Sequence, residues 1–187
     1  LDERTVKHYD RFVVLTEEDA GYWGKLPNIQ VIPNPLPFVS SETSPCTLHR
    51  VLAVGRYDFQ KNFSKLIELW GKIAPKYPDW HLDIYGDGTL RRDLELQVQA
   101  LGLSDTVYLA HPTHQMPEVY RGASIYLMTS RYEGLPMVLL EAQHMGLPIV
   151  SFACPCGPRD ILHPEEDGYL IELGDDVAFI KALSLLM

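Results

Sequence analysis

Short apolar runs alternate with longer segments whose apolar residues recur every three or four positions through most of the chain. The short runs indicate buried β-strands, and the longer spacing indicates helices with one buried face. The runs predict strands at 51–54, 81–85, 107–110, 125–128, 148–153 and 169–171. The segments between them predict helices at 62–77, 90–101, 116–121, 136–145 and 159–162, and a last helix from Asp175 onward.

This alternation predicts the fold class. Strands that alternate with helices form right-handed βαβ units, which build a parallel sheet. We therefore expect a Rossmann-like α/β domain with helices on both faces of the sheet. Ligands bind such sheets at the carboxyl ends of the strands. The loops that follow the strands, at 55–61, 86–88, 111–114, 129–135 and 154–157, are therefore the places to look for chemistry.

The first part of the chain has a different pattern. Apolar runs at 12–15 and 29–32 predict two strands, and Thr16, followed by three acidic residues, predicts a capped helix start between them. Prolines at 33, 35, 37 and 45 disfavour regular structure and predict a linker at roughly 33–47. We therefore divide the chain into an N-terminal segment, residues 1–37, and a main domain, residues 38–187.

Composition narrows the possible functions. The chain has 187 residues, of which 46% are hydrophobic and 22% charged, as in ordinary globular proteins. A formal charge of −9 argues against a general nucleic-acid binder, although it leaves room for a local cationic pocket. Three cysteines and no secretion signal favour a reducing, cytoplasmic setting. No uncharged apolar run approaches the roughly 18 residues that span a bilayer.

The loop at 55–61 is the first candidate site. Gly55 permits a tight turn, and Arg56 and Lys61 place two cations before a predicted helix start. Guanidinium and ammonium groups bind phosphate oxygens, and the N-terminus of a helix adds free N–H groups. The loop therefore fits a diphosphate. Two solvated surface cations are the alternative.

The loop at 129–136 is the second candidate. Gly134 allows a ligand to approach the backbone closely, and Pro136 suits the first turn of a helix. Glu133 precedes that helix and Glu141 lies inside it, so both carboxylates could line one crevice and accept hydrogen bonds from a sugar diol. The alternative is that Glu133 caps the helix and Glu141 pairs with a nearby Arg or Lys.

The other loops carry weaker signals. Gly86-Asp87-Gly88 is by itself a common turn. Cys154 and Cys156 are separated by one residue, which is not the spacing of a zinc knuckle, so no metal site is predicted. The histidines at 111 and 114 flank a Pro-Thr loop without metal-ligand spacing, and we expect this loop to be structural or to lie beside a base.

Taken in order, these motifs resemble the C-terminal domain of GT-B-fold retaining glycosyltransferases of family four, the glycosyl transferases group 1, over residues 31–186. The shared features are Val31-Ile32-Pro33-Asn34-Pro35, Gly55-Arg56 with Lys61-Asn62, Gly86-Asp87-Gly88, the pair Glu133 and Glu141 separated by seven residues, Gly146-Leu147-Pro148, and Gly168-Tyr169. The chain departs from the family at Leu109-Ala110, where Leu-Gly is frequent, which weakens any inference about the base.

The resemblance implies roles for individual residues. Arg56 and Lys61 would neutralise the diphosphate, Glu133 would bind the donor sugar, and Glu141 would bind the ribose hydroxyls. Arg56, Lys61 and Glu133 are thus the predicted catalytic residues. The predicted donor-binding residues are Gly55, Arg56, Lys61, Gly86, His111, Pro112, Thr113, Ser130, Glu133, Gly134, Leu135, Pro136, Leu139 and Glu141. The family implies a nucleotide-sugar donor, with UDP as the preferred nucleotide, and neither a metal nor another cofactor.

The resemblance also implies a larger enzyme. Residues 1–37 would end an acceptor-binding N-terminal domain, and the full-length protein would be a hexosyltransferase of polysaccharide biosynthesis with a glycan or lipid-linked acceptor. It would lie in the cytoplasm or peripherally at the inner face of the membrane, and this chain alone would be inactive in transfer. A nucleotide-sugar epimerase of the same fold and a non-catalytic nucleotide-binding module are the alternatives. The Glu133–Glu141 motif favours the transferase over the epimerase, and the Arg56 and Lys61 cations after the first strand of the main domain argue against a receiver-like module.

Overall fold

The main domain is built on one six-stranded sheet. The structure is a computed structural model that describes residues 2–24 and 26–187, so Leu1 and Lys25 of the predicted N-terminal segment lie outside the described residues. The strands are β3 (Arg50–Val54), β4 (His81–Tyr85), β5 (Val107–Ala110), β6 (Ile125–Met128), β7 (Ile149–Phe152) and β8 (Gly168–Ile171). They are all parallel in the order β5-β4-β3-β6-β7-β8, which confirms the predicted sheet.

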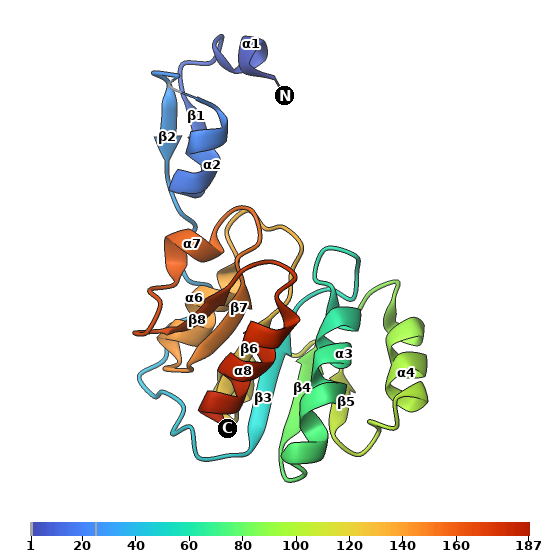
Figure 1. Ribbon diagram of the computed structural model, residues 1–187. Coiled ribbons are helices and arrows are strands. Elements are labelled where there is room, and N and C mark those ends of the chain that lie inside the picture. The colour runs from blue at the N-terminus through green and yellow to red at the C-terminus, as the bar shows by residue number, and fades with distance from the viewer. Residues whose placement is uncertain (1, 25) are drawn as a thin grey trace.

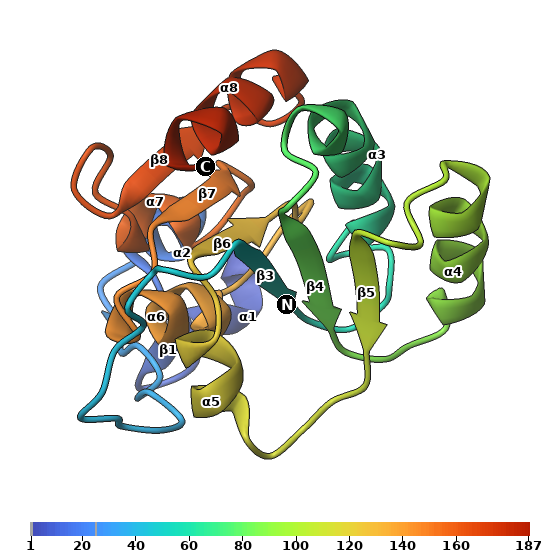
Figure 2. The same cartoon turned by 90° about the horizontal axis from the view of Figure 1, so that it is seen from below.

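Helices cover both faces of this sheet (Figure 2). On one face lie α3 (Phe63–Ile73), α4 (Arg91–Ala100) and α8 (Asp176–Leu186). On the other lie α5 (Met116–Arg121) and α6 (Met137–His144), and the short α7 (Pro158–Ile161) leads from β7 to β8. No helix in the described part of the chain is long and apolar enough to cross a membrane.

The core consists of two layers because successive side chains of a strand point to opposite faces. Val51 and Ala53 of β3 pack into the layer that contains Trp70 of α3, whereas Leu52 packs into the layer that contains Tyr120 of α5. Each fully buried large apolar side chain contributes about 1.5–3 kcal/mol. The two layers thus hold helices against both sides of the strands whose ends carry the candidate loops.

The predicted helix at 62–77 differs from the structure at both ends. It begins one residue later, after Asn62, whose backbone is left-handed (φ 55°). It gives way at Ile73 to a 3₁₀ turn, η1 (Ala74–Lys76). Pro75 explains the second difference, since proline has no N–H to donate in a continuing α-helix. The other predicted elements of the main domain agree to within one or two residues.

The N-terminal segment forms a separate unit (Figure 1). It contains α1 (Glu3–Val6), β1 (Phe12–Val14), α2 (Glu17–Tyr22) and β2 (Ile29–Val31), and its two strands pair in parallel. The predicted cap is confirmed, because the Thr16 hydroxyl accepts a hydrogen bond from Asp19 N at 3.1 Å. The segment touches the main domain where Glu18 N donates to Asp160 Oδ2 at 3.2 Å. The predicted linker falls within residues 32–49, which contain no helix or strand.

Candidate functional site

The two candidate loops meet at the middle of the sheet. β3 and β6 are neighbours, although they are far apart in sequence, so the direction of winding reverses between them. Such a switch point is the usual ligand site of an open α/β sheet. The loops after these strands are joined directly, because Arg131 N donates to Gln60 O at 2.8 Å and Asn62 Nδ2 donates to Thr129 O at 3.2 Å.

Lys61 and Glu133 form an ion pair between these loops. The Lys61 ammonium lies 2.7 Å from Glu133 Oε1, and the two side chains are only 15% and 6% exposed. Gly55 makes room for the lysine, since a Cβ at Gly55 would lie 3.0 Å from Lys61 Cγ. The alternative that Lys61 is a solvated surface cation is therefore wrong. The predicted phosphate-binding and sugar-binding residues touch each other.

Arg56 lies at the outer edge of the same cluster. Its side chain is 73% exposed, with Nε 3.3 Å from Asp58 Oδ2. It also donates from Nη2 to Gln60 Oε1 at 3.3 Å, and Gln60 Nε2 donates in turn to Glu133 Oε2 at 3.3 Å. Gln60 thus connects the exposed arginine to the largely buried ion pair. Gln60 was not predicted from the sequence, because an uncharged loop residue carries no chemical signal of its own.

Glu141 is held by a tyrosine. Tyr120 of α5 donates its hydroxyl hydrogen to Glu141 Oε2 at 2.6 Å. Burial raises the pKa of Glu141, while the Tyr120 hydrogen bond and the charge of Lys61 lower it. The partner is therefore a hydroxyl rather than the Arg or Lys of the alternative. Glu133 is not a helix cap either, because α6 is preceded by Pro136 at the cap position, with no side-chain cap bond.

A pocket of about 340 Å³ lies beside Arg56. It is lined by residues from the ends of β3, β4 and β5, including the predicted donor-binding residues Gly55, Arg56, Gly86, Pro112 and Thr113. Gly86 has no room for a side chain, because a Cβ there would lie 1.8 Å from Gly55 O. His111 is mostly exposed, and its Nδ1 lies 3.6 Å from Oδ2 of Asp87, which lines the pocket.

Tyr57 fixes the backbone around this pocket. Its hydroxyl lies 2.6 Å from Ile84 O and 3.0 Å from Ala110 O, so it can donate to either carbonyl at the ends of β4 and β5. Its own amide donates to Asp87 O at 2.8 Å. Three strand ends are thereby connected by one buried side chain. The sequence does not indicate this role, because the hydrophobic ring of a tyrosine predicts burial only.

The other predicted donor-binding residues are buried to different extents. Ser130 is buried, and its hydroxyl has no hydrogen-bond partner among the described residues. Gly134 is exposed, Leu135 is half-buried, and Pro136 is buried against Gly157. Leu139 is fully buried in the core. Donor contact by these residues stays a prediction.

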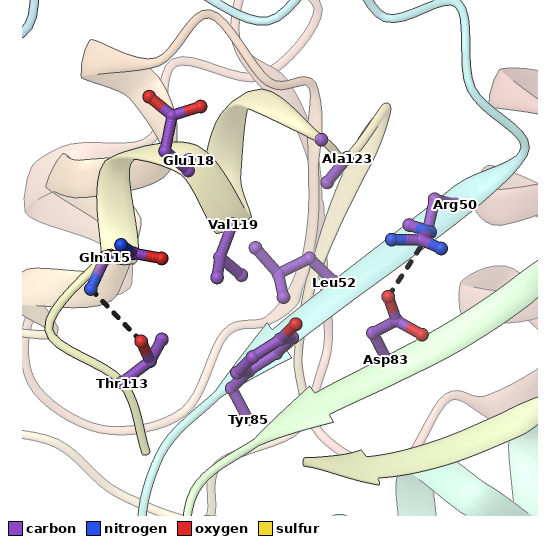
Figure 3. Close-up of a pocket in the computed structure, with 10 residues that line it drawn as sticks. Arg50, Leu52, Asp83, Tyr85, Thr113, Gln115, Glu118, Val119 and Ala123 are labelled. Carbon is purple, nitrogen blue, oxygen red and sulfur yellow. Dashed lines mark hydrogen bonds and ion pairs between the residues drawn. The ribbon is translucent and has the colours of Figure 1, made fainter. Parts of the chain in front are cut away.

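A second hollow of about 260 Å³, which shares Tyr85 and Thr113 with the first pocket, lies between the sheet and α5 (Figure 3). The Arg50 guanidinium lies 3.4 Å from the Asp83 carboxylate on its wall. Burial raises the pKa of Asp83, and the charge of Arg50 opposes that effect. This hollow was not predicted from the sequence, because a polar residue within a strand is usually one that faces solvent.

Comparison with known proteins shows the family of the chain. Residues 41–187 match the family described as glycosyl transferases group 1. The chain is 34% identical over 188 residues to the amylovoran biosynthesis glycosyltransferase AmsD of Erwinia amylovora, with 95% of this chain and 52% of AmsD covered. It is 35% identical to an uncharacterised glycosyltransferase of Haemophilus influenzae, with the same coverage. The chain thus spans about half the length of these relatives.

Solved structures show the same fold. The lipopolysaccharide outer core galactosyltransferase WaaB matches all of this chain and 57% of its own, with a TM-score of 0.80 and 26% identity. A mutant of S. aureus TarM, in complex with Fondaparinux, alpha-GlcNAc-glycerol and UDP, matches 98% of this chain and 38% of its own, with a TM-score of 0.89 and 23% identity. The Rossmann-like sheet is thus that of GT-B glycosyltransferases. The chain belongs to the glycosyl transferases group 1 family, as its motifs predict.

Proposed function

We propose that this chain binds the nucleotide-diphosphate-sugar donor of a glycosyltransferase, with a UDP-sugar as the donor. One observation carries the proposal: the Lys61–Glu133 pair lies at the switch point, next to the exposed Arg56 and a pocket large enough for a base. The UDP bound to TarM, a protein of the same fold, supports this choice of nucleotide.

The proposed arrangement follows the charges. The base occupies the pocket at Gly86, Pro112 and Thr113, and the diphosphate lies between Arg56 and Lys61. When the bond between the sugar and the diphosphate breaks, its electron pair goes to the phosphate oxygen. The two cations stabilise that developing charge, and electrostatic stabilisation of this kind supplies much of the rate enhancement in many enzymes. Glu133 accepts hydrogen bonds from sugar hydroxyls, and Glu141 accepts them from the ribose.

We further propose that the full-length protein transfers the sugar, with retention of configuration, to a hydroxyl of a glycan or lipid-linked acceptor, whose proton passes to the departing diphosphate or to water. The acceptor would bind to a domain that precedes this chain, and residues 1–37 would be its end. The full-length enzyme would act in polysaccharide biosynthesis, in the cytoplasm or peripherally at the inner face of the membrane. This chain alone should therefore turn over no acceptor, and transfer by the purified chain would contradict the division into two half-sites.

Thermal unfolding with UDP, GDP and ADP, each with EDTA, tests donor binding. A nucleotide at about 100 times its dissociation constant stabilises the fold by about 2.7 kcal/mol. We expect a shift with UDP in the presence of EDTA. No shift with any nucleotide at millimolar concentration would refute the proposal. Incubation of the full-length protein with UDP-sugars and an acceptor glycan then distinguishes transfer from epimerisation and from inert binding.

The two glutamates can be distinguished by ligand. Glu141→Gln should weaken the binding of UDP and of the UDP-sugar equally, because both ligands contain the ribose. Glu133→Gln should weaken only the UDP-sugar, by about 1–3 kcal/mol. Calorimetry on both variants measures this difference, after circular dichroism has shown that both are folded. Unchanged affinity for both ligands in both folded variants would remove the carboxylates from the site.

A further inference from the structure

Tyr120 is a buried tyrosine whose hydroxyl has a specific partner. The side chain has no exposed surface, and its ring packs against Phe38 and Tyr126, with ring centroids 6.1 and 5.9 Å away. Phenylalanine would fill this space equally well. A buried hydroxyl is unfavourable unless it forms a hydrogen bond, and that of Tyr120 bonds to Glu141 Oε2 at 2.6 Å. The hydroxyl therefore acts on the carboxylate rather than on the packing.

The hydrogen bond fixes one half of the Glu141 carboxylate. A carboxylate has two oxygens that can each accept hydrogen bonds. Oε2 is engaged by Tyr120, and the hydrogen bonds of the described residues leave Oε1 available. The charge of Lys61 also acts on Glu141 and favours its ionised form. The hydrogen bond also favours the ionised form, which is the better acceptor.

The helix that carries Tyr120 also reaches the base pocket. Met116, one turn earlier on α5, lines the pocket beside Pro112 and Thr113. Residues four apart lie on the same face of a helix, so α5 presents one side chain to the base pocket and one to Glu141. The position of α5 therefore sets the distance between the base pocket and the carboxylate.

We propose that Tyr120 is a positioning residue, which orients the Glu141 carboxylate toward the ribose hydroxyls of a nucleoside diphosphate. The proposal rests on the proposed function, because it concerns the same donor site. Through Glu141, Tyr120 makes the site prefer a ligand that carries both ribose hydroxyls.

The test compares UDP with 2′,3′-dideoxy-UDP, which lacks both hydroxyls. Calorimetry on the wild-type chain should show a preference for UDP of about tenfold or more, the range of one or two hydrogen bonds to a charged group. Tyr120→Phe removes a single oxygen, and we expect it to reduce the preference to about twofold, with 2′,3′-dideoxy-UDP affinity unchanged. Tyr126→Phe is the matched control, because Tyr126 is equally buried but bonds to the Val54 backbone. It should keep the wild-type preference.

A second comparison tests whether Tyr120 acts through Glu141. In the Glu141→Gln background, Tyr120→Phe should cause no further change in the UDP preference, because its target carboxylate is gone. No UDP binding by the wild-type chain would overturn the proposed function itself. UDP binding without ribose preference, an unchanged preference in Tyr120→Phe, or equal losses in Tyr120→Phe and Tyr126→Phe would overturn only the assignment of Tyr120.

Discussion

Replacement of Lys61 should destabilise the fold as well as the nucleotide complex. Lys61→Met keeps the apolar stem of the side chain and removes the ammonium 2.7 Å from Glu133. Glu133, whose side chain is 6% exposed, would then be a buried carboxylate without a cation. Loss of one partner of a buried ion pair costs about 3–5 kcal/mol. We expect about 3 kcal/mol, the lower end of that range, because Gln60 still donates to Glu133 at 3.3 Å.

A double-mutant cycle isolates the pair. Urea unfolding at pH 7 gives the free energies of wild type, Lys61→Met, Glu133→Gln and the double variant. The double variant should recover much of the loss seen in Lys61→Met, since no unpaired charge remains buried, and the coupling should be about 2 kcal/mol. Lys65→Met is the control, because Lys65 pairs with Glu68 at 2.8 Å and with Asp176 at 3.1 Å, but all three side chains are more exposed. That change should cost at most about 1 kcal/mol.

The cycle also decides how binding data on Lys61 are read. If the free-energy losses of the two single variants add up to the loss of the double variant within about 0.5 kcal/mol, the two residues do not interact. In that case the ion pair is refuted. If they couple, the loss of UDP affinity in Lys61→Met must be compared with uridine, which has no phosphate. A loss of about 1.5–3 kcal/mol for UDP alone would then measure the phosphate contact itself.

Three further changes test other parts of the site. Arg56→Ala should weaken the binding of UDP by about 1.5–3 kcal/mol and leave the binding of uridine unchanged. The unfolding midpoint should also stay the same, because the Arg56 side chain is largely exposed. Equal calorimetric losses for UDP and uridine would contradict this expectation. Because the folded-state pKa of Glu141 is raised, its contribution to stability is present below the ordinary value of 4.5 and is lost as the pH rises through the raised value. Glu141→Gln should therefore increase the free energy of unfolding at pH 7 and lose that gain in acid, whereas a difference independent of pH would contradict the reasoning. Gly86→Ala should lower the free energy of unfolding by about 3 kcal/mol or more, because its Cβ would strike Gly55 O. Gly134→Ala, which meets nothing within 4 Å, is the urea-unfolding control, and equal losses in both would contradict the clash.

The sheet could be predicted because its determinants are local. Each buried strand and each helix is determined by a few consecutive residues. Because ligands bind such sheets at the carboxyl ends of the strands, the sequence also indicates the loops that contain Arg56 and Glu133. The four-residue α1 was not predicted, since so short a helix depends on its Asp2 cap and its surroundings rather than on periodicity.

The partners of the site residues could not be predicted for a different reason. Tyr120 and Glu141 are separated by 21 residues, and their contact depends on how α5 packs against α6. Gln60 takes part only because the backbone turn before α3 brings it between Arg56 and Glu133. Chemical type indicates which residues can react, whereas tertiary packing decides which of them meet.

The hydrogen bonds of Tyr57 affect the entropy cost of binding the proposed donor. A flexible loop must be ordered when a ligand binds, and that ordering opposes association. Here the turn after β3 is already fastened to the ends of β4 and β5 by one side chain and one amide. Under the proposed function, a nucleoside diphosphate would therefore meet a surface whose main chain is already in place. Its affinity would then depend on complementarity of shape and charge more than on ordering of the backbone at the pocket.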